Sequence, residues 1–288
     1  MIANSRCIAC NLSKQERKIR EDSDEQKKKE YIHKVLKILY DYGSKECAPM
    51  VEKRIKDIFK EYYEEDVDYV ALKHKYNQYM LEKEEEIRAH IQKNNDIETC
   101  IKYVCAGNYI DFGVNNKIDD QLLQGLLDKV NELEIPKEEV EHLEAELAQA
   151  KTLLYITDNC GEIVLDKIFI EELKNKYKNL EITAMVRGGI ASNDATMEDA
   201  EEVGLTQVVP VIGNGAAIMG TVKEQLSEEA KQKIQEADVI IAKGMGNFES
   251  MYQEGMNPYF LLLCKCELYT KTFGVEMFQP IFCKEERL

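Results

Sequence analysis

Tryptophan is absent from this 288-residue sequence, and histidine and proline are scarce. The four histidines, at positions 33, 74, 90 and 142, all lie in the first half. This inventory excludes a Ser-His-Asp triad and a histidine-built zinc site in the second half. Basic residues are also few: 38 Lys and Arg accompany 54 Asp and Glu, for a net charge of −16. The acidic excess argues against nucleic acid and anionic membrane surfaces as partners.

Long apolar runs are missing as well. No run approaches the roughly 20 residues that a membrane span needs. The first residues, Met1 to Cys7, are not followed by the apolar core of a secretion signal. The nine cysteines are an odd number in a long chain, which favours reduced thiols. We therefore expect a cytoplasmic protein whose 44% hydrophobic residues build a substantial core.

Glycine divides the chain into two parts, because four of its 15 copies precede residue 150 and eleven follow it. In the first part, apolar residues recur at helical spacing. They predict helices within 31–42, 51–62, 67–87 and 122–130, and a further helix that begins near Pro136. The second part alternates between apolar strands and amphipathic helices. It predicts strands at 153–157, 182–186, 208–212, 239–242 and 259–264, with helices at 163–177, 196–203 and 223–236.

This alternation predicts an α/β fold with a parallel sheet covered by helices on both faces. Pro210 places the third strand at a sheet edge or a strand end. We expect a helical subdomain at 1–150 and an α/β subdomain at 151–288. No oligomeric state is predicted.

Polar or glycine-rich clusters follow four of the predicted strands. Parallel strands end along one edge of a sheet, and ligands bind in the crevice there. Four segments distant in the sequence should therefore form one site. They are Asp158–Glu162, Arg187–Asp194, Gly213–Gly215 and Lys243–Glu249.

The residue types in these clusters suit phosphoryl chemistry. Asp158, Asn159 and Asp194 offer hard oxygen ligands, which suit Mg²⁺ or Mn²⁺ better than a structural zinc. Glycine-rich turns that lead into helices present N–H groups to an anion, and Lys243 adds a cation for a phosphate oxygen.

Each feature also has a simpler interpretation. Asp158, Asn159 and Asp194 are favoured helix caps, and Glu162 and Glu249 are first-turn acids that suit the helix dipole. The coincidence at four strand ends is what favours a site. A dinucleotide fingerprint at 213–220 is rejected because its third glycine falls at 220 rather than 218. The phosphate-loop motif is absent, and no Asp-x-Asp nucleophile motif stands at the end of a predicted strand.

At these residues the sequence resembles the metal-dependent damage-control phosphatases, also called domain of unknown function 89. The motifs Asp158–Glu162, Val186–Gly189 with Asn193–Thr196, and Lys243–Glu249 carry the resemblance. Cys7–Cys10, Gly107–Gly113 and Leu263–Glu267 with Phe273–Val275 are similar to the prokaryotic-type branch.

The resemblance implies a helical N-terminal subdomain on a Rossmann-like subdomain, and hydrolysis of small phosphate monoesters such as sugar phosphates or damaged phosphometabolites. It further implies a divalent metal (Mn²⁺, Mg²⁺, Co²⁺ or Ni²⁺) held by Asp158, Asn159 and Asp194, and a phosphate contact from Lys243.

The remaining site residues are predicted as follows. Arg187 adds a bidentate contact, and the amides of Gly188 and Gly189 hold phosphoryl oxygens. Glu162 and Glu249 orient water or substrate hydroxyls. Asn193, Asn247, Asn108 and Asp111 are the other predicted substrate contacts, the last two because Asn-x-x-Asp between glycines interrupts a helical pattern.

Three questions stay open at this stage. Cys7-x-x-Cys10 is either a redox pair, or half of a thiolate metal site completed by Cys264 and Cys266, or a set of reduced thiols, which we favour. An S-adenosylmethionine-dependent carboxyl methyltransferase is a rival function, although the expected acidic end of the second strand is replaced by Arg187. A non-catalytic sensor of phosphometabolites is the other rival.

Overall fold

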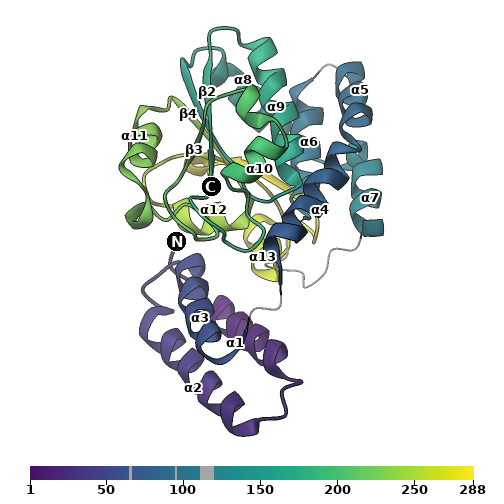
Figure 1. Cartoon of the computed structure of the whole chain (residues 1–288). Coiled ribbons are helices and arrows are strands. Elements are labelled where there is room, and N and C mark those ends of the chain that lie inside the picture. The colour runs from purple at the N-terminus through teal and green to yellow at the C-terminus, as the bar shows by residue number, and fades with distance from the viewer. Residues whose placement is uncertain (65–66, 95, 111–119) are drawn as a thin grey trace.

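The computed structural model describes residues 1–64, 67–94, 96–110 and 120–288. They form a six-stranded sheet covered by helices, with a three-helix bundle at one end of the molecule (Figure 1). The strands are β1 Thr152–Ile156, β2 Glu181–Val186, β3 Val211–Gly213, β4 Val239–Lys243, β5 Tyr259–Leu263 and β6 Pro280–Lys284. Their order across the sheet is β3-β2-β1-β4-β5-β6.

Strands β1 to β5 are parallel, and β6 pairs antiparallel with β5. The α/β prediction is thus confirmed, and β3 lies at the sheet edge as Pro210 indicated. The last strand was not predicted, because its five residues lack a following helix that would mark a parallel unit. The helix predicted at 223–236 is a short 3₁₀ turn followed by α11 (Glu228–Glu236), since Ser227 caps α11 through its side chain.

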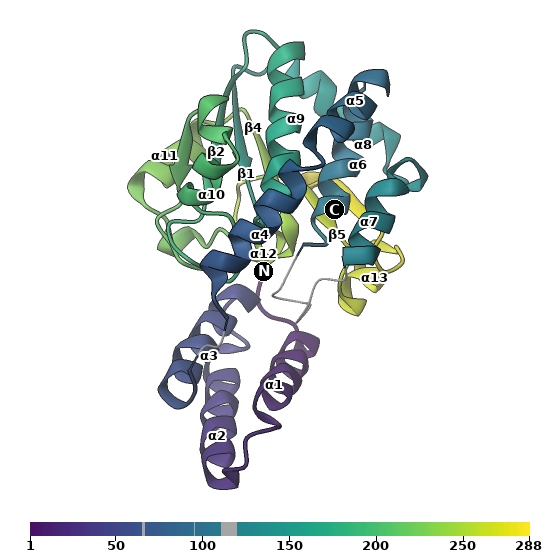
Figure 2. The same ribbon diagram turned by 45° about the vertical axis from the view of Figure 1, so that its right-hand side comes forward.

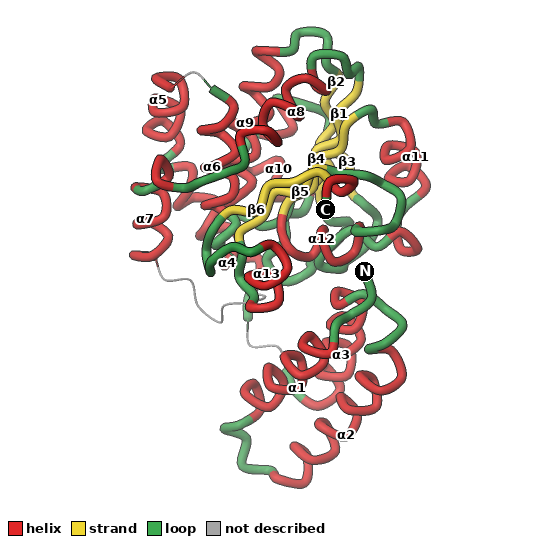
Figure 3. The backbone as a smooth tube through the Cα atoms, turned by 180° about the vertical axis from the view of Figure 1, so that it is seen from behind, coloured by secondary structure: helices red, strands yellow, loops and turns green. Residues whose placement is uncertain are grey.

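The two faces of the sheet bury alternate residues of each central strand. In β1, Leu153 and Tyr155 join one core and Leu154 and Ile156 join the other. Helices α11, α12 and α13 cover the second core, and Figure 3 shows the sheet between the two helical layers. The helices that follow β1 are α9 Glu162–Lys176, α10 Met197–Glu202, α11 Glu228–Glu236, α12 Gly244–Met251 and α13 Glu267–Phe273.

The helices before β1 divide into two groups. The first group is a bundle with its own core, centred on Tyr31, Val35 and Ile55. The second group packs on the sheet and shares its first core (Figure 2). The bundle consists of α1 Ser5–Ile19, α2 Glu25–Tyr42 and α3 Ala48–Tyr62. The sheet-packed helices are α4 Tyr69–Leu81, α5 Glu84–Asn94, α6 Ile97–Gly107, α7 Asp120–Asp128 and α8 Lys137–Leu147.

The predicted division at residue 150 therefore does not separate two cores. The packing instead separates α1–α3 from the rest, because helical periodicity shows that a face is buried but not against which partner. A small apolar cluster joins the two parts, in which Cys47 and Met50 of the bundle contact Ala216, Ile218 and Val222. Within the described residues, no helix is both long enough and apolar enough to cross a membrane.

Candidate functional site

The site lies where β1, β2 and β4 end. Asp158 and Asn159 follow β1, and Asp194 lies between β2 and α10. The two segments pair through their backbones: the Cys160 N–H donates to the Asn193 carbonyl at 2.8 Å, and the Ala195 N–H to the Asp158 carbonyl at 2.7 Å. This short antiparallel bridge sets Asn159 opposite Asp194. Topology and local pairing thus bring the three predicted metal ligands together.

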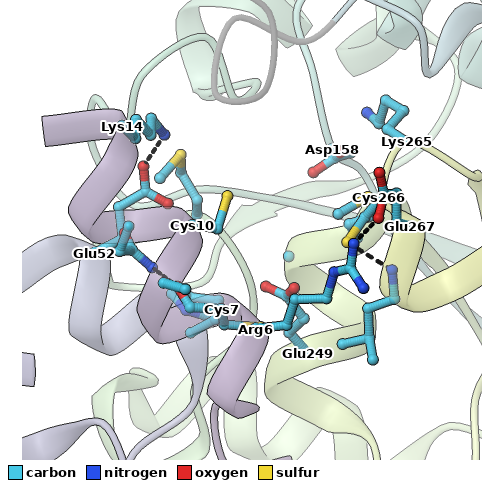
Figure 4. A pocket seen from close by; sticks show the side chains of 18 of the residues that line it. Arg6, Cys7, Cys10, Lys14, Glu52, Asp158, Glu249, Lys265, Cys266 and Glu267 are labelled. Atoms are coloured by element: carbon cyan, nitrogen blue, oxygen red, sulfur yellow. Dashed lines mark hydrogen bonds and ion pairs between the residues drawn. The ribbon is translucent and has the colours of Figure 1, made fainter. Parts of the chain in front are cut away.

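These three side chains form the floor of a cleft of about 930 Å³. They are almost fully buried, with Asp158, Asn159 and Asp194 exposed by 5%, 2% and 3%. One wall comes from the bundle and the other from the α/β part. The bundle wall includes Arg6, Cys7, Cys10, Lys14, Arg17 and Glu52, and the α/β wall includes Met245, Gly246, Glu249, Lys265, Cys266 and Glu267. In Figure 4, Asp158 and Lys265 lie across the cleft from Lys14 and Glu52.

The Asp158 carboxylate accepts hydrogen bonds from three directions. Its Oδ2 accepts from the side-chain amides of Asn108 at 2.9 Å and Asn159 at 2.7 Å. Its Oδ1 receives a long contact of 3.4 Å from Arg187 Nη2. Burial, then the charges of Asp194 and Glu162, raise the pKa of the Asp158 carboxyl well above its usual range. A cation bound at this carboxylate would offset that repulsion.

Gly244 makes room for this carboxylate. A Cβ at position 244 would lie 1.8 Å from Asp158 Oδ2, and the residue has a φ of +80°. Only glycine satisfies both conditions. The turn between β4 and α12 is therefore shaped around Asp158, which explains the glycine after Lys243.

Arg187 is fully buried beneath the floor. Its Nε donates to Asp194 Oδ2 at 2.6 Å, and its Nη1 to Asn247 Oδ1 at 3.1 Å. With the contact to Asp158, the guanidinium contacts both aspartates, and its Nε, Nη1 and Nη2 atoms all face acceptors of the protein. Arg187 is thus a positioning residue in this structure, rather than one placed to form the predicted bidentate substrate contact.

Lys243 lies deeper than a phosphate contact would require. Its side chain is fully buried, and its Nζ donates to Glu162 Oε1 at 2.6 Å and Asp166 Oδ1 at 2.9 Å. Burial opposes the charged form, but the carboxylates of Asp166 and Glu162 outweigh it and raise the pKa of Lys243. Glu162 Oε2 in turn accepts from Asn108 and Asn159, both at 2.9 Å. Lys243 thereby neutralises the layer that supports the floor.

The other residues predicted to contact substrate lie either beneath the floor or in the cleft lining. Asn193 donates to Asn159 Oδ1 at 3.0 Å, and Asn108 is described above, so both hold floor residues. Asn247 is buried against the carbonyl of Lys243. Of these predicted contacts, Glu249 alone lines the cleft among the residues that the structure describes. Gly188 and Gly189 are not among the described residues that line it. The Gly188 amide already donates to Asn214 Oδ1 at 2.9 Å.

Asp111 lies outside the described residues, so its predicted role is not addressed by the structure.

Lys265 is a cleft residue that the motif analysis did not select. It follows β5, is 5% exposed, and donates from Nζ to the Asn108 carbonyl at 2.7 Å. It also acts electrostatically on Asp158. The expectation that polar residues after strand ends form the site was applied to four predicted strands. Applied to the fifth strand, it would have selected Lys265. No local sequence pattern identifies the bundle residues of the wall, because the packing of the bundle against the α/β part brings them to the cleft.

The floor fits a divalent cation that prefers oxygen ligands. Its donors are two carboxylates and one amide oxygen, without sulfur or imidazole. Across the described residues, no group of three or more His, Cys, Asp or Glu side chains is placed to hold a metal ion. The Asp–Asn–Asp set contains only two such side chains. The same finding gives no support to a four-thiolate site, and all nine cysteines are free thiols.

Known proteins resemble this chain over most of its length. The sequence model of the Damage-control phosphatase ARMT1-like domain matches residues 3–281. An uncharacterised protein of Methanocaldococcus jannaschii is 31% identical over 275 residues, which cover 91% of this chain and 88% of that protein. A damage-control phosphatase of Pyrococcus horikoshii is 35% identical over 181 residues, 62% of each chain.

A crystal structure of a DUF89 family protein from Pyrococcus horikoshii superposes with a TM-score of 0.76 at 26% identity and covers 99% of both chains. The resemblance seen in the sequence motifs is therefore confirmed over nearly the whole length. This chain belongs to the damage-control phosphatase family with the ARMT1-like domain.

Proposed function

We propose that this protein is a metal-dependent phosphatase that hydrolyses small phosphate monoesters, such as sugar phosphates or damaged phosphometabolites. One observation carries the proposal: Asp158, Asn159 and Asp194 meet at the floor of a cleft large enough for a metabolite. Relatives named as damage-control phosphatases support the same class of reaction.

The three floor residues would hold a divalent cation, with Mn²⁺, Mg²⁺, Co²⁺ and Ni²⁺ as the candidates. Such an ion, when bound, polarises a phosphoryl oxygen and neutralises charge that develops on the phosphoryl group. The chain supplies the orientation. Arg187 fixes Asp194 through a hydrogen bond of 2.6 Å and makes a longer contact of 3.4 Å with Asp158. Asn193 donates to the Asn159 side-chain oxygen at 3.0 Å and so fixes the orientation of that amide.

Lys265 and the first turn of α12 would bind the phosphoryl oxygens that the cation does not reach. Lys265 brings a positive charge to the edge of the floor, in place of the predicted Lys243. Met245 and Gly246 line the cleft in the first turn of α12, where N–H groups have no acceptor within the helix. Lys243 keeps Glu162 and Asp166 paired under the site.

Glu249 faces the substrate body rather than the reacting phosphorus. Its carboxylate lines the α/β wall and accepts a hydrogen bond from the Tyr269 hydroxyl at 3.1 Å. We assign it to substrate hydroxyl groups. Glu162 acts from below by holding Asn108 and Asn159.

The test is hydrolysis of p-nitrophenyl phosphate by chelator-stripped protein, with each of the four metals added back in turn. We expect turnover to vanish on stripping and to return with at least one metal. No turnover with any metal, by protein shown to be folded, would contradict the proposal and favour a sensor. A thermal shift with phosphate esters would then identify the sensor.

A further inference from the structure

Helix α1 is basic in an acidic protein. Its residues Ser5–Ile19 contain four basic side chains and one acidic side chain, whereas the whole chain carries a net charge of −16. Three of those cations line the cleft, namely Arg6, Lys14 and Arg17. Together with Cys10 they recur at spacings of four, four and three residues. They therefore lie on one face of the helix.

The three cations differ in how their charges are matched. Arg6 forms an ion pair with Glu267 across the cleft, and Lys14 forms one with Glu52 of α3 (Figure 4). Arg17 is exposed, and no ion pair ties it to another part of the described chain. Within the described part of the chain, Arg17 is thus a bundle-wall cation without a carboxylate in ion-pair contact.

The cleft extends along helix α1, because both Arg6 and Arg17 line it. The Arg6 side chain extends from α1 to Cys266 and Glu267 of the opposite wall (Figure 4). At 1.5 Å of rise per residue, the backbone of Arg17 lies about 16 Å further along α1. The volume of about 930 Å³ is at the upper end of the range for drug-sized ligands. Met219 and Met245 add apolar side chains to the cleft lining.

We propose that the substrate carries a second anionic group at the end remote from the ester, and that Arg17, aided by Lys14, binds this group. The substrate class is then a phosphate ester with an elongated body and a distal carboxylate or phosphate. This inference rests on the proposed phosphatase function, because the floor binds the ester end. Arg17 becomes a specificity residue, supplied by a part of the chain that takes no part in the chemistry.

The experiment compares ω-carboxyalkyl phosphates of four to ten carbons with their carboxyl methyl esters, in the metal-loaded full-length protein. The readout is the ratio of kcat/KM for each acid to that for its ester. We expect a preference of about fivefold for the acids, at an intermediate chain length, as for one partly exposed charge pair. Arg17→Gln should abolish this preference.

Arg20→Gln is the matched control. Arg20 lies one turn further along the helix, pairs with Glu16, and is not among the described residues that line the cleft. It should retain both the preference and the turnover of p-nitrophenyl phosphate. Equal kcat/KM values for acids and esters in the unaltered protein, or a preference that survives Arg17→Gln, would overturn the inference.

Failure of the phosphatase proposal would appear separately, as absent turnover of every ester with every metal. Calorimetric titration with ω-carboxyalkyl phosphonates and their methyl esters, in the presence of Mn²⁺, then decides the inference. An Arg17-dependent preference for the acids would uphold recognition of a second anion. Equal affinities in the unaltered protein and Arg17→Gln would overturn it.

Discussion

The floor and the bundle wall of the cleft are built on opposite principles. In the floor, Asp158, Asn159 and Asp194 are buried, and their polar atoms bond to one another or to Arg187. In the wall, α1 presents Arg17, which is exposed, and Lys14, which is half-buried and pairs with Glu52. Buried, mutually bonded groups hold one geometry, whereas exposed long side chains adapt. The floor therefore holds one geometry, and the wall carries side chains that can adapt.

The largest expected difference between the two regions is in stability, tested by the same substitution in each. Lys243→Met leaves Glu162 and Asp166 buried without their cation and should lower the free energy of unfolding by about 3–5 kcal/mol. Lys14→Met removes the partly exposed pair with Glu52 and should cost about 1 kcal/mol or less. Urea unfolding measures both. Similar losses in the two variants would contradict the distinction.

A smaller effect, on activity, should follow from filling the space beside Asp158. Gly244→Ala places a methyl group against Asp158 Oδ2 and strains a residue at φ +80°. We expect kcat/KM to fall about 100-fold, since a displacement near 1 Å in a catalytic group has that effect. Gly255→Ala is the control: its φ is +78°, yet no atom lies within 4 Å of the added Cβ.

Backbone strain alone would make the two alanine variants alike. The steric argument therefore fails if Gly255→Ala loses as much activity as Gly244→Ala. Thermal unfolding of both variants separates a loss of activity from a loss of folded protein.

The smallest of these effects concerns the edge of the floor. Lys265→Met should lower kcat/KM for p-nitrophenyl phosphate about tenfold, as expected when one hydrogen bond to a charged group is lost. Lys265→Arg keeps the charge and should recover part of the activity. Unchanged activity in the Met variant would show that Lys265 serves only its bond to the Asn108 carbonyl.

Sequence reasoning correctly placed residues together where their proximity depends on chain topology. The strand-end rule placed Asp158, Asn159 and Asp194 together, although the last lies 35 residues from Asn159. The resemblance named the same three residues. Both arguments depend on a local pattern, in which an apolar strand is followed by polar residues. The structure contains these strands, with the polar residues at their ends.

The sequence could not show how deep each polar residue lies. Arg187 and Lys243 follow or end apolar strands just as Asp158 does, but their long side chains lie beneath the floor. Arg187 bonds to Asp194 of the floor, and Lys243 bonds to Glu162 in the layer below it. Partner choice among buried charges depends on three-dimensional packing. For the same reason the docking of α1, and with it Arg17, has no counterpart in any local pattern.

The most direct test of the account compares two buried aspartates that differ only in location. Asp194 belongs to the floor, whereas Asp199 pairs with Lys73 and caps α10 away from the cleft. Metal-dependent hydrolysis of p-nitrophenyl phosphate is measured for Asp194→Asn and Asp199→Asn at equal concentrations of folded protein. We predict a loss on the order of 1,000-fold for Asp194→Asn and near-normal turnover for Asp199→Asn. Normal turnover by Asp194→Asn would contradict the account.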